Sequence, residues 1–431
     1  MTDQPSPHRA AARAWAWIPS LYVAQALPYV VVMSLSVVLY KQLGLSNTEL
    51  ALWTSWLYLP WVIKPLWAPV VDLLGAKRRW IVLLQGLAGA SLAALALTLP
   101  AGDAVRWSLV AFWLLAFASA THDIAADGFY LLALDAHEQA AFVGVRSLFY
   151  RLSMLAGQGG LVVLAGLWTD RLGTPVQAWQ AVFGLLAAVF TVLALWHLAV
   201  LPRPGADRPA PRGGTLVQDM LAVFRGFFGQ RDLARILAFL LLYRLAEAQL
   251  LKLVVPFLMD PPAAGGLGLS TQAVGWVYGT VGVAALMAGG LLGGWWISRR
   301  GLDRSLLPLV AALNVPNLVY VALAATRPEA PMLVAIAIGA EQFGYGLGFA
   351  AYLVALLMIA GTDDNPHATA RYALCTGFMA LGMMLPGMVA GWLQERLGYI
   401  GFFVWVCVST LPSFWAAARL PVRAGFGRRT D

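Results

Sequence analysis

The chain has 431 residues, of which 60% are hydrophobic and only 12% are charged. Soluble globular proteins carry about 25% charged residues, so this composition excludes an ordinary soluble domain and indicates a protein that crosses a membrane several times. The net charge of +8 does not predict a nucleic-acid partner. The basic residues gather in particular loops, which is the bias expected of the cytoplasmic side of a membrane protein.

Hydrophobic segments long enough to cross the hydrocarbon core, which takes about 20 residues in a helix, recur along the whole chain. They predict an all-α polytopic membrane protein that lies in the lipid bilayer. The first segment follows Arg9 and Arg13 and has no convincing small-residue cleavage site. We therefore expect it to remain in the protein as the first membrane helix and not to be removed as a signal peptide. Twelve segments are predicted, at 14–40, 47–71, 80–100, 107–133, 141–167, 176–201, 234–258, 272–298, 305–325, 332–360, 368–394 and 399–419.

A short basic loop joins the second and third segments. It contains Asp72, Gly75 and the triplet Lys77, Arg78 and Arg79. A basic triplet indicates the cytoplasmic side, and an aspartate before a turn can accept hydrogen bonds from a helix N-terminus or pair with an arginine. We expect these five residues to form a conformational latch. The pattern resembles the loop between the second and third helices of the major facilitator superfamily.

The polar connection at 202–232 divides the segments six and six, which predicts an N-terminal half at 1–201 and a C-terminal half at 233–431. The sequence Arg-Leu-Gly follows a segment at 171–173 and again at 396–398, which favours a duplicated six-helix unit. Because cytoplasmic loops are the more basic ones, the loop charges predict that both termini are cytoplasmic.

The second part of this connection, residues 215–230, predicts an amphipathic helix on the membrane surface. Its apolar face carries Phe224, Phe227 and Phe228, which we expect to enter the lipid.

Two carboxylates lie in the fourth segment. Asp123 and Asp127 are four residues apart, so they share one helix face. An ionised group near the centre of a membrane helix costs about 2.5–3.5 kcal/mol on insertion scales, so it normally faces a partner or a water-filled cavity. Asp123 is a candidate for proton coupling or substrate contact. For Asp127, a structural ion pair to Arg146 or Arg151 is favoured, with the same candidate role as the alternative.

Two Tyr-Arg-Leu elements follow in the fifth and seventh segments, at Tyr150-Arg151 and at Tyr243-Arg244. The planar fork of arginine suits carboxylate or phosphate, and tyrosine offers a stacking face and a hydroxyl. These residues predict a lining for an anionic or sugar-bearing substrate. In the alternative, Arg244 pairs locally with Glu247, three residues further along the helix.

The tenth segment combines Glu341, Gln342 and Tyr345 with glycines at 344, 346 and 348. Glycines are poor helix formers and permit close packing, so we expect a thinned or bent helix that lines the cavity and forms a gate. The glycines at 289–290 and 293–294 predict simple packing points.

Motifs for catalysis are missing from the sequence. It has no Walker P-loop, no nucleophile elbow with a plausible triad and no cluster with metal-ligand spacing, so we expect no enzyme, no cofactor and no metal. Cys375 and Cys407 lie in apolar stretches and are expected to be small buried hydrophobic residues.

Five elements of the sequence, spread over both halves, belong together. They are Lys64-Pro65-Leu66-Trp67-Ala68-Pro69-Val70-Val71-Asp72, the segment ending Asp123-Ile124-Ala125-Ala126-Asp127, Tyr150-Arg151-Leu152-Ser153, Leu242-Tyr243-Arg244-Leu245 and Glu341-Gln342-Phe343-Gly344. In these elements the chain resembles the AmpG-type muropeptide permeases of the major facilitator superfamily. This resemblance implies the twelve-helix fold of that superfamily and the import of anhydromuramyl peptides with an attached N-acetylglucosamine. It also implies dependence on the proton gradient, a bacterial inner membrane and, as the superfamily default, a monomer.

The sequence does not determine which substrate is transported. The same broad group includes acetyl-coenzyme A transporters and siderophore permeases, and His122, Gly128 and Glu247 depart from the pattern of the muropeptide members. A muropeptide-like amino-sugar saccharide is favoured, with a siderophore, another oligosaccharide or an acyl-coenzyme A cargo as alternatives. A non-transporting membrane sensor is less favoured, because it would require a soluble output domain.

Overall fold

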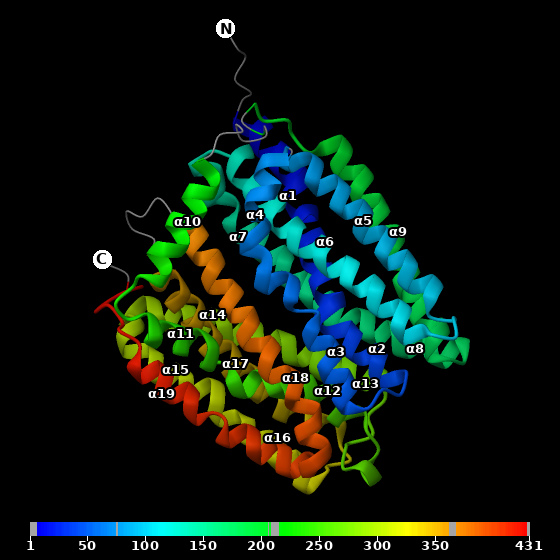
Figure 1. Ribbon diagram of the computed structural model, residues 1–431. Coiled ribbons are helices and arrows are strands. Elements are labelled where there is room, and N and C mark those ends of the chain that lie inside the picture. The colour runs from blue at the N-terminus through cyan, green and yellow to red at the C-terminus, as the bar shows by residue number, and fades with distance from the viewer. Residues whose placement is uncertain (1–6, 75, 206, 208–214, 362–367, 429–431) are drawn as a thin grey trace. The chain divides into compact units, whose positions relative to one another are not determined.

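The computed structural model describes residues 7–74, 76–205, 207, 215–361 and 368–428, and these fold as helices and connecting turns (Figure 1). The first part of the chain forms α1 (Pro7–Val30), α2 (Ser36–Gln42), α3 (Asn47–Trp56), α4 (Leu59–Leu74), α5 (Lys77–Thr98), α6 (Ala104–Ala133), α7 (Ala136–Leu155), α8 (Val162–Leu172) and α9 (Pro175–Val200). The second part forms α10 (Thr215–Phe228), α11 (Leu233–Leu242), α12 (Leu245–Met259), α13 (Thr271–Val274), α14 (Val283–Arg300), α15 (Leu302–Asn314), α16 (Leu318–Thr326), α17 (Pro331–Ala360), α18 (Ala368–Val408) and α19 (Leu411–Arg419). Short π-helical turns at 31–35, 156–161 and 275–282 join helices within a segment.

Within the described ranges, nine helical stretches are long and apolar enough to cross a membrane. They correspond to the twelve predicted segments with three differences. The second segment is divided into α3 and α4, and the seventh into α11 and α12, so neither contains one long helix. The eleventh and twelfth segments are continuous apart from a kink at Gly398, where φ is 66°. The expectation of an all-helical polytopic membrane protein is confirmed.

The two divided segments break for different reasons. In the second segment, Pro60 follows the break directly, and proline cannot donate the backbone hydrogen bond that would continue α3 into α4. The break in the seventh segment has no neighbouring proline or glycine. Arg244 leaves the helical region there, with φ of −109° and ψ of 22°, and its side chain makes the contacts described below.

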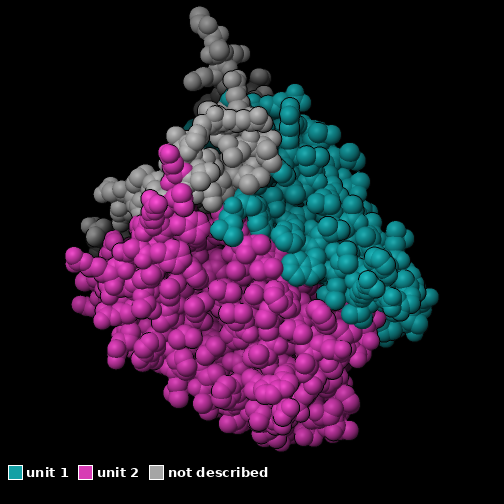
Figure 2. Space-filling view, viewed as in Figure 1, with its two compact units in different colours: residues 1–35, 66–157, 168–212 teal, residues 36–65, 158–167, 213–431 magenta. Residues whose placement is uncertain are grey.

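The chain forms two compact units, which are described separately (Figure 2). Unit 1 contains residues 1–35, 66–157 and 168–212, and unit 2 contains residues 36–65, 158–167 and 213–431.

A buried polar chain links four helices of unit 1. The Ser20 hydroxyl lies 2.9 Å from His197 Nε2, and His197 Nδ1 lies 2.8 Å from Gln85 Oε1. The amide nitrogen of Gln85 lies 3.0 Å from His122 Nε2. These residues come from α1, α9, α5 and α6. Since a buried polar group without a partner costs roughly 1–3 kcal/mol, this chain favours one arrangement of the four helices.

In unit 2, tyrosines join α11 to α17. The rings of Tyr243 and Tyr352 stack at 4.9 Å, and both side chains are completely buried. The Tyr243 hydroxyl donates to the Gly348 carbonyl at 2.9 Å, and the Tyr352 hydroxyl donates to the Leu240 carbonyl at 2.7 Å. Tyr243 therefore uses its hydroxyl to pack helices.

The glycines of α17 serve close packing. A Cβ atom added at Gly348 would lie 2.6 Å from the Leu309 carbonyl oxygen of α15, and one added at Gly346 would overlap the Leu286 carbonyl oxygen of α14. Gly289 and Gly293 meet the backbone of α17 in the same way, as predicted, whereas a Cβ atom added at Gly294 would meet nothing within 4 Å, so the prediction is wrong for Gly294. The glycines do not interrupt the helix, because α17 is helical throughout from Pro331 to Ala360. Tight packing on both neighbours offsets the low helix propensity of glycine.

The amphipathic helix of the connection is present as α10, but its contacts differ from the prediction. Phe227 is completely buried and its ring stacks on Phe378 of α18 at 5.8 Å. Phe224 packs against the hydrophobic core cluster that contains Phe227, whereas Phe228 is 45% exposed. The prediction that all three rings enter lipid is therefore wrong for Phe227, which packs α10 against α18.

Candidate functional site

The first buried charged centre of unit 2 is built around Arg244, at the start of α12. Its guanidinium lies 3.3 Å from the Glu247 carboxylate and donates to the Tyr345 hydroxyl at 2.5 Å. It also lies over the Phe349 ring, 4.7 Å from the ring centroid. Arg244 and Glu247 are each less than 10% exposed. The local pairing of these two residues, one of the two predicted alternatives, is therefore what the structure contains.

The break between α11 and α12 positions this centre. Because Arg244 is not helical, its side chain approaches Glu247 from the helix N-terminus, where a carboxylate is also favoured by the helix dipole. Aromatic rings of α17 cover the guanidinium on the other side. An arginine that is held by one carboxylate and flanked by rings can exchange that carboxylate for an anionic group of a ligand, while the rings can stack on a sugar.

The second centre is the Glu341 carboxylate on α17, which is 2% exposed. It accepts hydrogen bonds from the Tyr320 hydroxyl at 2.9 Å and from the Gln342 amide at 3.0 Å. Among the described residues, no cation lies within ion-pair distance of it. A buried carboxylate held by neutral donors can lose its charge by taking a proton without leaving a cation unpaired.

The third centre is Lys252, in the middle of α12 and 3% exposed. Its ammonium donates to the Thr54 hydroxyl of α3 at 3.1 Å and lies 5.0 Å from the centroid of the Tyr58 ring. Thr54 in turn donates to the Leu50 carbonyl at 2.7 Å. Lys252 and Thr54 are 198 residues apart, so the local sequence does not indicate this contact.

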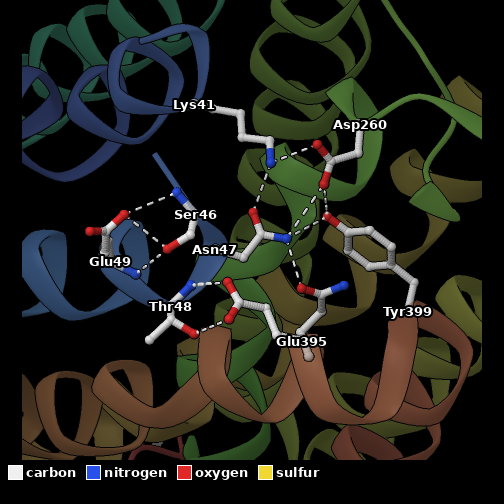
Figure 3. A network of polar contacts seen from close by, with 9 residues as sticks. Lys41, Ser46, Asn47, Thr48, Glu49, Asp260, Glu395 and Tyr399 are labelled. Carbon is white, nitrogen blue, oxygen red and sulfur yellow. Dashed lines mark hydrogen bonds and ion pairs between the residues drawn. The ribbon is translucent and has the colours of Figure 1, made fainter. Parts of the chain in front are cut away.

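A polar cluster joins the ends of α2, α3 and α12 to α18 beside its kink at Gly398 (Figure 3). It lies at the end of the first segment away from the N-terminus. Lys41 pairs with Asp260 at 2.6 Å and donates to Asn47 at 2.8 Å. The Asn47 amide donates to Gln394 at 2.7 Å and to the Tyr399 hydroxyl at 3.0 Å. Tyr399 completes the ring by donating to Asp260 at 2.5 Å. We call these five residues the Lys41–Asp260 cluster.

The N-terminus of α3 is held on α18 beside this cluster. Glu395 accepts from the Thr48 backbone nitrogen at 2.9 Å and from the Thr48 hydroxyl at 2.6 Å. Ser46 and Glu49 form a capping box that begins the helix, as Figure 3 shows. Gly391 allows this approach, because a Cβ atom there would overlap the Asn47 carbonyl.

In unit 1, the two predicted carboxylates of α6 have different contacts. Asp127 accepts from Arg146 of α7 at 3.3 Å. The Arg146 guanidinium also lies 4.7 Å from the centroid of the Tyr22 ring and 5.0 Å from that of Tyr130. Of the two partners that the sequence left open for Asp127, the structure contains Arg146.

Asp123 lies one turn earlier on α6 and is partly buried. It is near enough to the Tyr150 hydroxyl of α7 to act on it electrostatically, together with Tyr29 and Asp127. Arg151, the neighbour of Tyr150, is also partly buried. The predicted residues Asp123, Asp127 and Tyr150 are therefore brought together in unit 1.

The predicted latch loop is described only in part. Gly75 and the side chain of Asp72 lie outside the described residues, and Arg79 is exposed. A different aspartate caps α5: Asp207 accepts from the backbone nitrogens of Lys77, at 2.7 Å, and Arg78, at 3.0 Å. Asp207 lies in the polar connection, so only folding brings it to this helix end.

The side chain of Arg78 adds a second link in this loop. It donates to the carbonyls of Leu201 and Leu198 at the end of α9. The basic triplet is thus used partly for joining helices α5 and α9 within unit 1.

The described side chains contain no group of three His, Cys, Asp or Glu residues that could hold a metal ion. Both cysteines are free, with Cys375 buried and Cys407 partly buried.

Comparison with known proteins identifies the class. A sequence profile of the Major Facilitator Superfamily matches residues 20–380, and the chain belongs to this superfamily of multi-pass membrane transporters. It is therefore a transporter and not an enzyme. The fold agrees: a crystal structure of a D-xylose–proton symporter superposes with a TM-score of 0.70 over 96% of this chain and 98% of that chain, at 11% identity.

Within the superfamily, the chain is an AmpG-like transporter. It is 30% identical to the anhydromuropeptide permease of Escherichia coli (strain K12) over 357 residues, which cover 82% of this chain and 68% of that protein. It is 24% identical to a protein named AmpG 4 in Rickettsia conorii, over 92% of this chain and 93% of that protein. The resemblance found in the sequence is confirmed.

Proposed function

We propose that this protein imports muropeptide-like amino-sugar saccharides, of the N-acetylglucosaminyl-anhydromuramyl peptide type, in symport with protons. The observation that carries the proposal is the 30% identity with an anhydromuropeptide permease over 82% of the chain. The buried centres of unit 2 support it, because they combine aromatic rings, an arginine and two carboxylates.

Each centre has a role in this proposal. Arg244, with the Tyr345 and Phe349 rings, holds the saccharide, and Glu247 is the carboxylate that the substrate replaces on Arg244. Glu341 is the proton carrier in unit 2, because its partners Tyr320 and Gln342 are neutral donors. Asp123, near Tyr150, is the corresponding candidate in unit 1, whereas Asp127 holds α6 to α7 through Arg146.

The proposal includes alternating access between the two six-helix halves, 1–201 and 233–431. In this proposal, the chain lies in a bacterial inner membrane as a monomer, and both of its termini are in the cytoplasm. The Lys41–Asp260 cluster then lies on the periplasmic side and closes that side. The loop of Asp72, Gly75, Lys77, Arg78 and Arg79 is the latch on the cytoplasmic side.

The experiment that tests this function is uptake of labelled N-acetylglucosaminyl-anhydromuramyl tripeptide into right-side-out proteoliposomes. Uptake is measured with and without an inward proton gradient, and with the Glu341→Gln variant as the uncoupled control. Gradient-dependent accumulation by the wild type alone is the expected result. If folded wild-type protein takes up no tripeptide but does accumulate a siderophore, a different oligosaccharide or an acyl-coenzyme A, the proposed cargo is wrong.

A further inference from the structure

We propose that Lys252, together with Thr54 and Ser55, binds a carboxylate group of the transported substrate. This inference rests on the proposed function, since it names the part of the substrate that one site recognises. It starts from the different charge partners of three cations of unit 2: Lys41, which is partly buried, and Arg244 and Lys252, which are buried.

Two of these cations have a carboxylate partner. Lys41 pairs with Asp260 at 2.6 Å, and Arg244 pairs with Glu247 at 3.3 Å. Lys252 is 3% exposed and so more deeply buried than either of them, but among the described residues its ammonium is within 4 Å of no carboxylate. It is held by the Thr54 hydroxyl and the face of the Tyr58 ring. Removing the ammonium of Lys252 from water costs free energy, and a hydroxyl and an aromatic ring offset only a small part of that cost. A bound anionic group would offset much more of it.

Ser55 provides a second and independent observation. Its hydroxyl is fully buried and has no hydrogen-bond partner in the described structure. The hydroxyl lies against Gly387 of α18, where an added Cβ atom would be 2.7 Å from Ser55 Oγ and 3.4 Å from Lys252 Cε. The ammonium stem and the unused hydroxyl therefore border the same glycine, and both supply donors.

The chemistry of these donors selects a carboxylate. An ammonium and a serine hydroxyl can donate to the two oxygens of one carboxylate, and Thr54 keeps the ammonium oriented through its own bond to Leu50. The stem peptide of a muropeptide carries such carboxylates, whereas a neutral saccharide does not.

The position of Lys252 explains how a substrate reaches it. Lys252 lies eight residues from Asp260 along α12, which is about 12 Å in a helix. Ser55 lies the same number of residues from Asn47 along the second segment. The site is therefore about two turns inside the Lys41–Asp260 cluster, and it becomes accessible when α3 separates from α12 and α18.

The test measures binding to the full-length protein in lipid nanodiscs by calorimetry. The probes are N-acetylglucosaminyl-anhydromuramyl tripeptide and the same tripeptide with its carboxylates converted to amides. We expect the wild type to bind the acid at least tenfold more tightly than the amide, and Lys252→Gln to bind the two equally. Lys252→Arg should retain part of the preference.

Arg235→Gln is the matched control, because it removes an exposed cation from the same segment. An unchanged preference in Lys252→Gln would overturn the site.

A second pair of probes separates this site from the proposed cargo. N-acetylmuramic acid and N-acetylglucosamine differ by a lactyl carboxylate, and their effect on the melting temperature of the nanodisc protein is measured at millimolar concentration. Stabilisation by the acid alone, lost in Lys252→Gln and reduced in Ser55→Ala, supports the site even where the tripeptide does not bind. Two results would count against the carboxylate site at Lys252, whether or not the tripeptide is the transported substrate. In one, N-acetylmuramic acid stabilises the wild type and Lys252→Gln equally; in the other, it does not stabilise the wild type.

Discussion

Lys41 and Asp260 form an ion pair of 2.6 Å between the end of α2 and the end of α12. The pair is only 13% and 15% exposed, and both partners also bind neutral neighbours, Asn47 and Tyr399. An ion pair of this kind lies between the exposed and the buried cases, so its removal is expected to cost on the order of 1–3 kcal/mol. In the proposed transport cycle, that free energy stabilises the state that is closed on this side.

The first prediction concerns this pair. Asp260→Asn should shift the equilibrium toward the state that is open at the cluster, and Lys41→Asp with Asp260→Lys should partly restore closure. The measurement uses Ala51→Cys, a completely buried position of α3, in a background without Cys375 and Cys407. Labelling by a membrane-impermeant maleimide from the cluster side should increase about tenfold, consistent with 1.4 kcal/mol.

The matched control for this experiment is Asp232→Asn. Asp232 pairs with Arg235 at 3.0 Å, but this pair is 41% and 57% exposed, so its loss should leave labelling of the Ala51→Cys position unchanged. Equal labelling in Asp260→Asn and in the parent protein would show that the ion pair does not control closure.

The second prediction concerns Gly391. A side chain at this position would overlap the Asn47 carbonyl, so Gly391→Val should prevent α3 from approaching α18. Transport should be lost while membrane insertion is retained, and the Ala51→Cys position should be labelled as in the open state. Gly86→Ala is the control, because a Cβ atom at Gly86 meets nothing within 4 Å. Wild-type transport by Gly391→Val would contradict the assigned packing.

The third prediction concerns the carboxylate of Glu341. Glu341→Gln should abolish accumulation driven by a proton gradient and preserve exchange of internal for external substrate, because a glutamine retains the shape but carries no transferable proton. Tyr320→Phe, which removes one hydrogen bond to this carboxylate, should reduce the rate without uncoupling. If the Glu341→Gln variant still accumulates substrate against its gradient at the wild-type rate, Glu341 is not the residue that couples substrate uptake to protons.

The fourth prediction concerns Asp123, the candidate carrier in α6. Asp123→Asn should abolish uphill uptake without loss of membrane insertion. Asp127→Asn, which removes the contact with Arg146, should instead lower thermal stability, by about 1 kcal/mol for a partly exposed pair. Uphill uptake at the wild-type rate by Asp123→Asn would remove this residue from the coupling role.

The fifth prediction concerns Arg244 and Glu247. Arg244→Gln leaves a buried carboxylate without its cation, so it should destabilise the protein by about 3–5 kcal/mol. Arg244→Met with Glu247→Leu removes both charges and should recover most of that stability without recovering transport. Thermal unfolding in detergent measures the first effect and proteoliposome uptake measures the second. Transport by the double variant at the wild-type rate would exclude both residues from the substrate site.

Several features of the protein followed from local sequence. Twelve apolar segments determine helices, because a backbone in hydrocarbon must satisfy its hydrogen bonds within the segment. The motifs around Asp127, Arg151 and Glu341 were sufficient to indicate the AmpG-like family. The pairing of Arg244 with Glu247 was also within reach, since residues three apart on a helix are neighbours.

Other features depended on contacts between distant segments. Asn47 and Asp260 are 213 residues apart, and Gln85 and His197 are 112 apart. Lys41, Asp260 and Asp207 look like ordinary loop charges in the sequence, and Ser55 looks like an ordinary small residue. Their partners are decided by helix packing, in which glycines such as Gly391 determine how closely two helices approach.

The sequence by itself therefore determined that this chain is a helical membrane transporter of a known family, because hydrophobicity and short motifs are properties of single segments. The tertiary structure decided which buried charges are paired, which are held only by neutral groups, and where the seventh segment breaks. The physical reason is that the cost of a buried charge depends on which groups surround it, and those groups come from helices far apart in the chain.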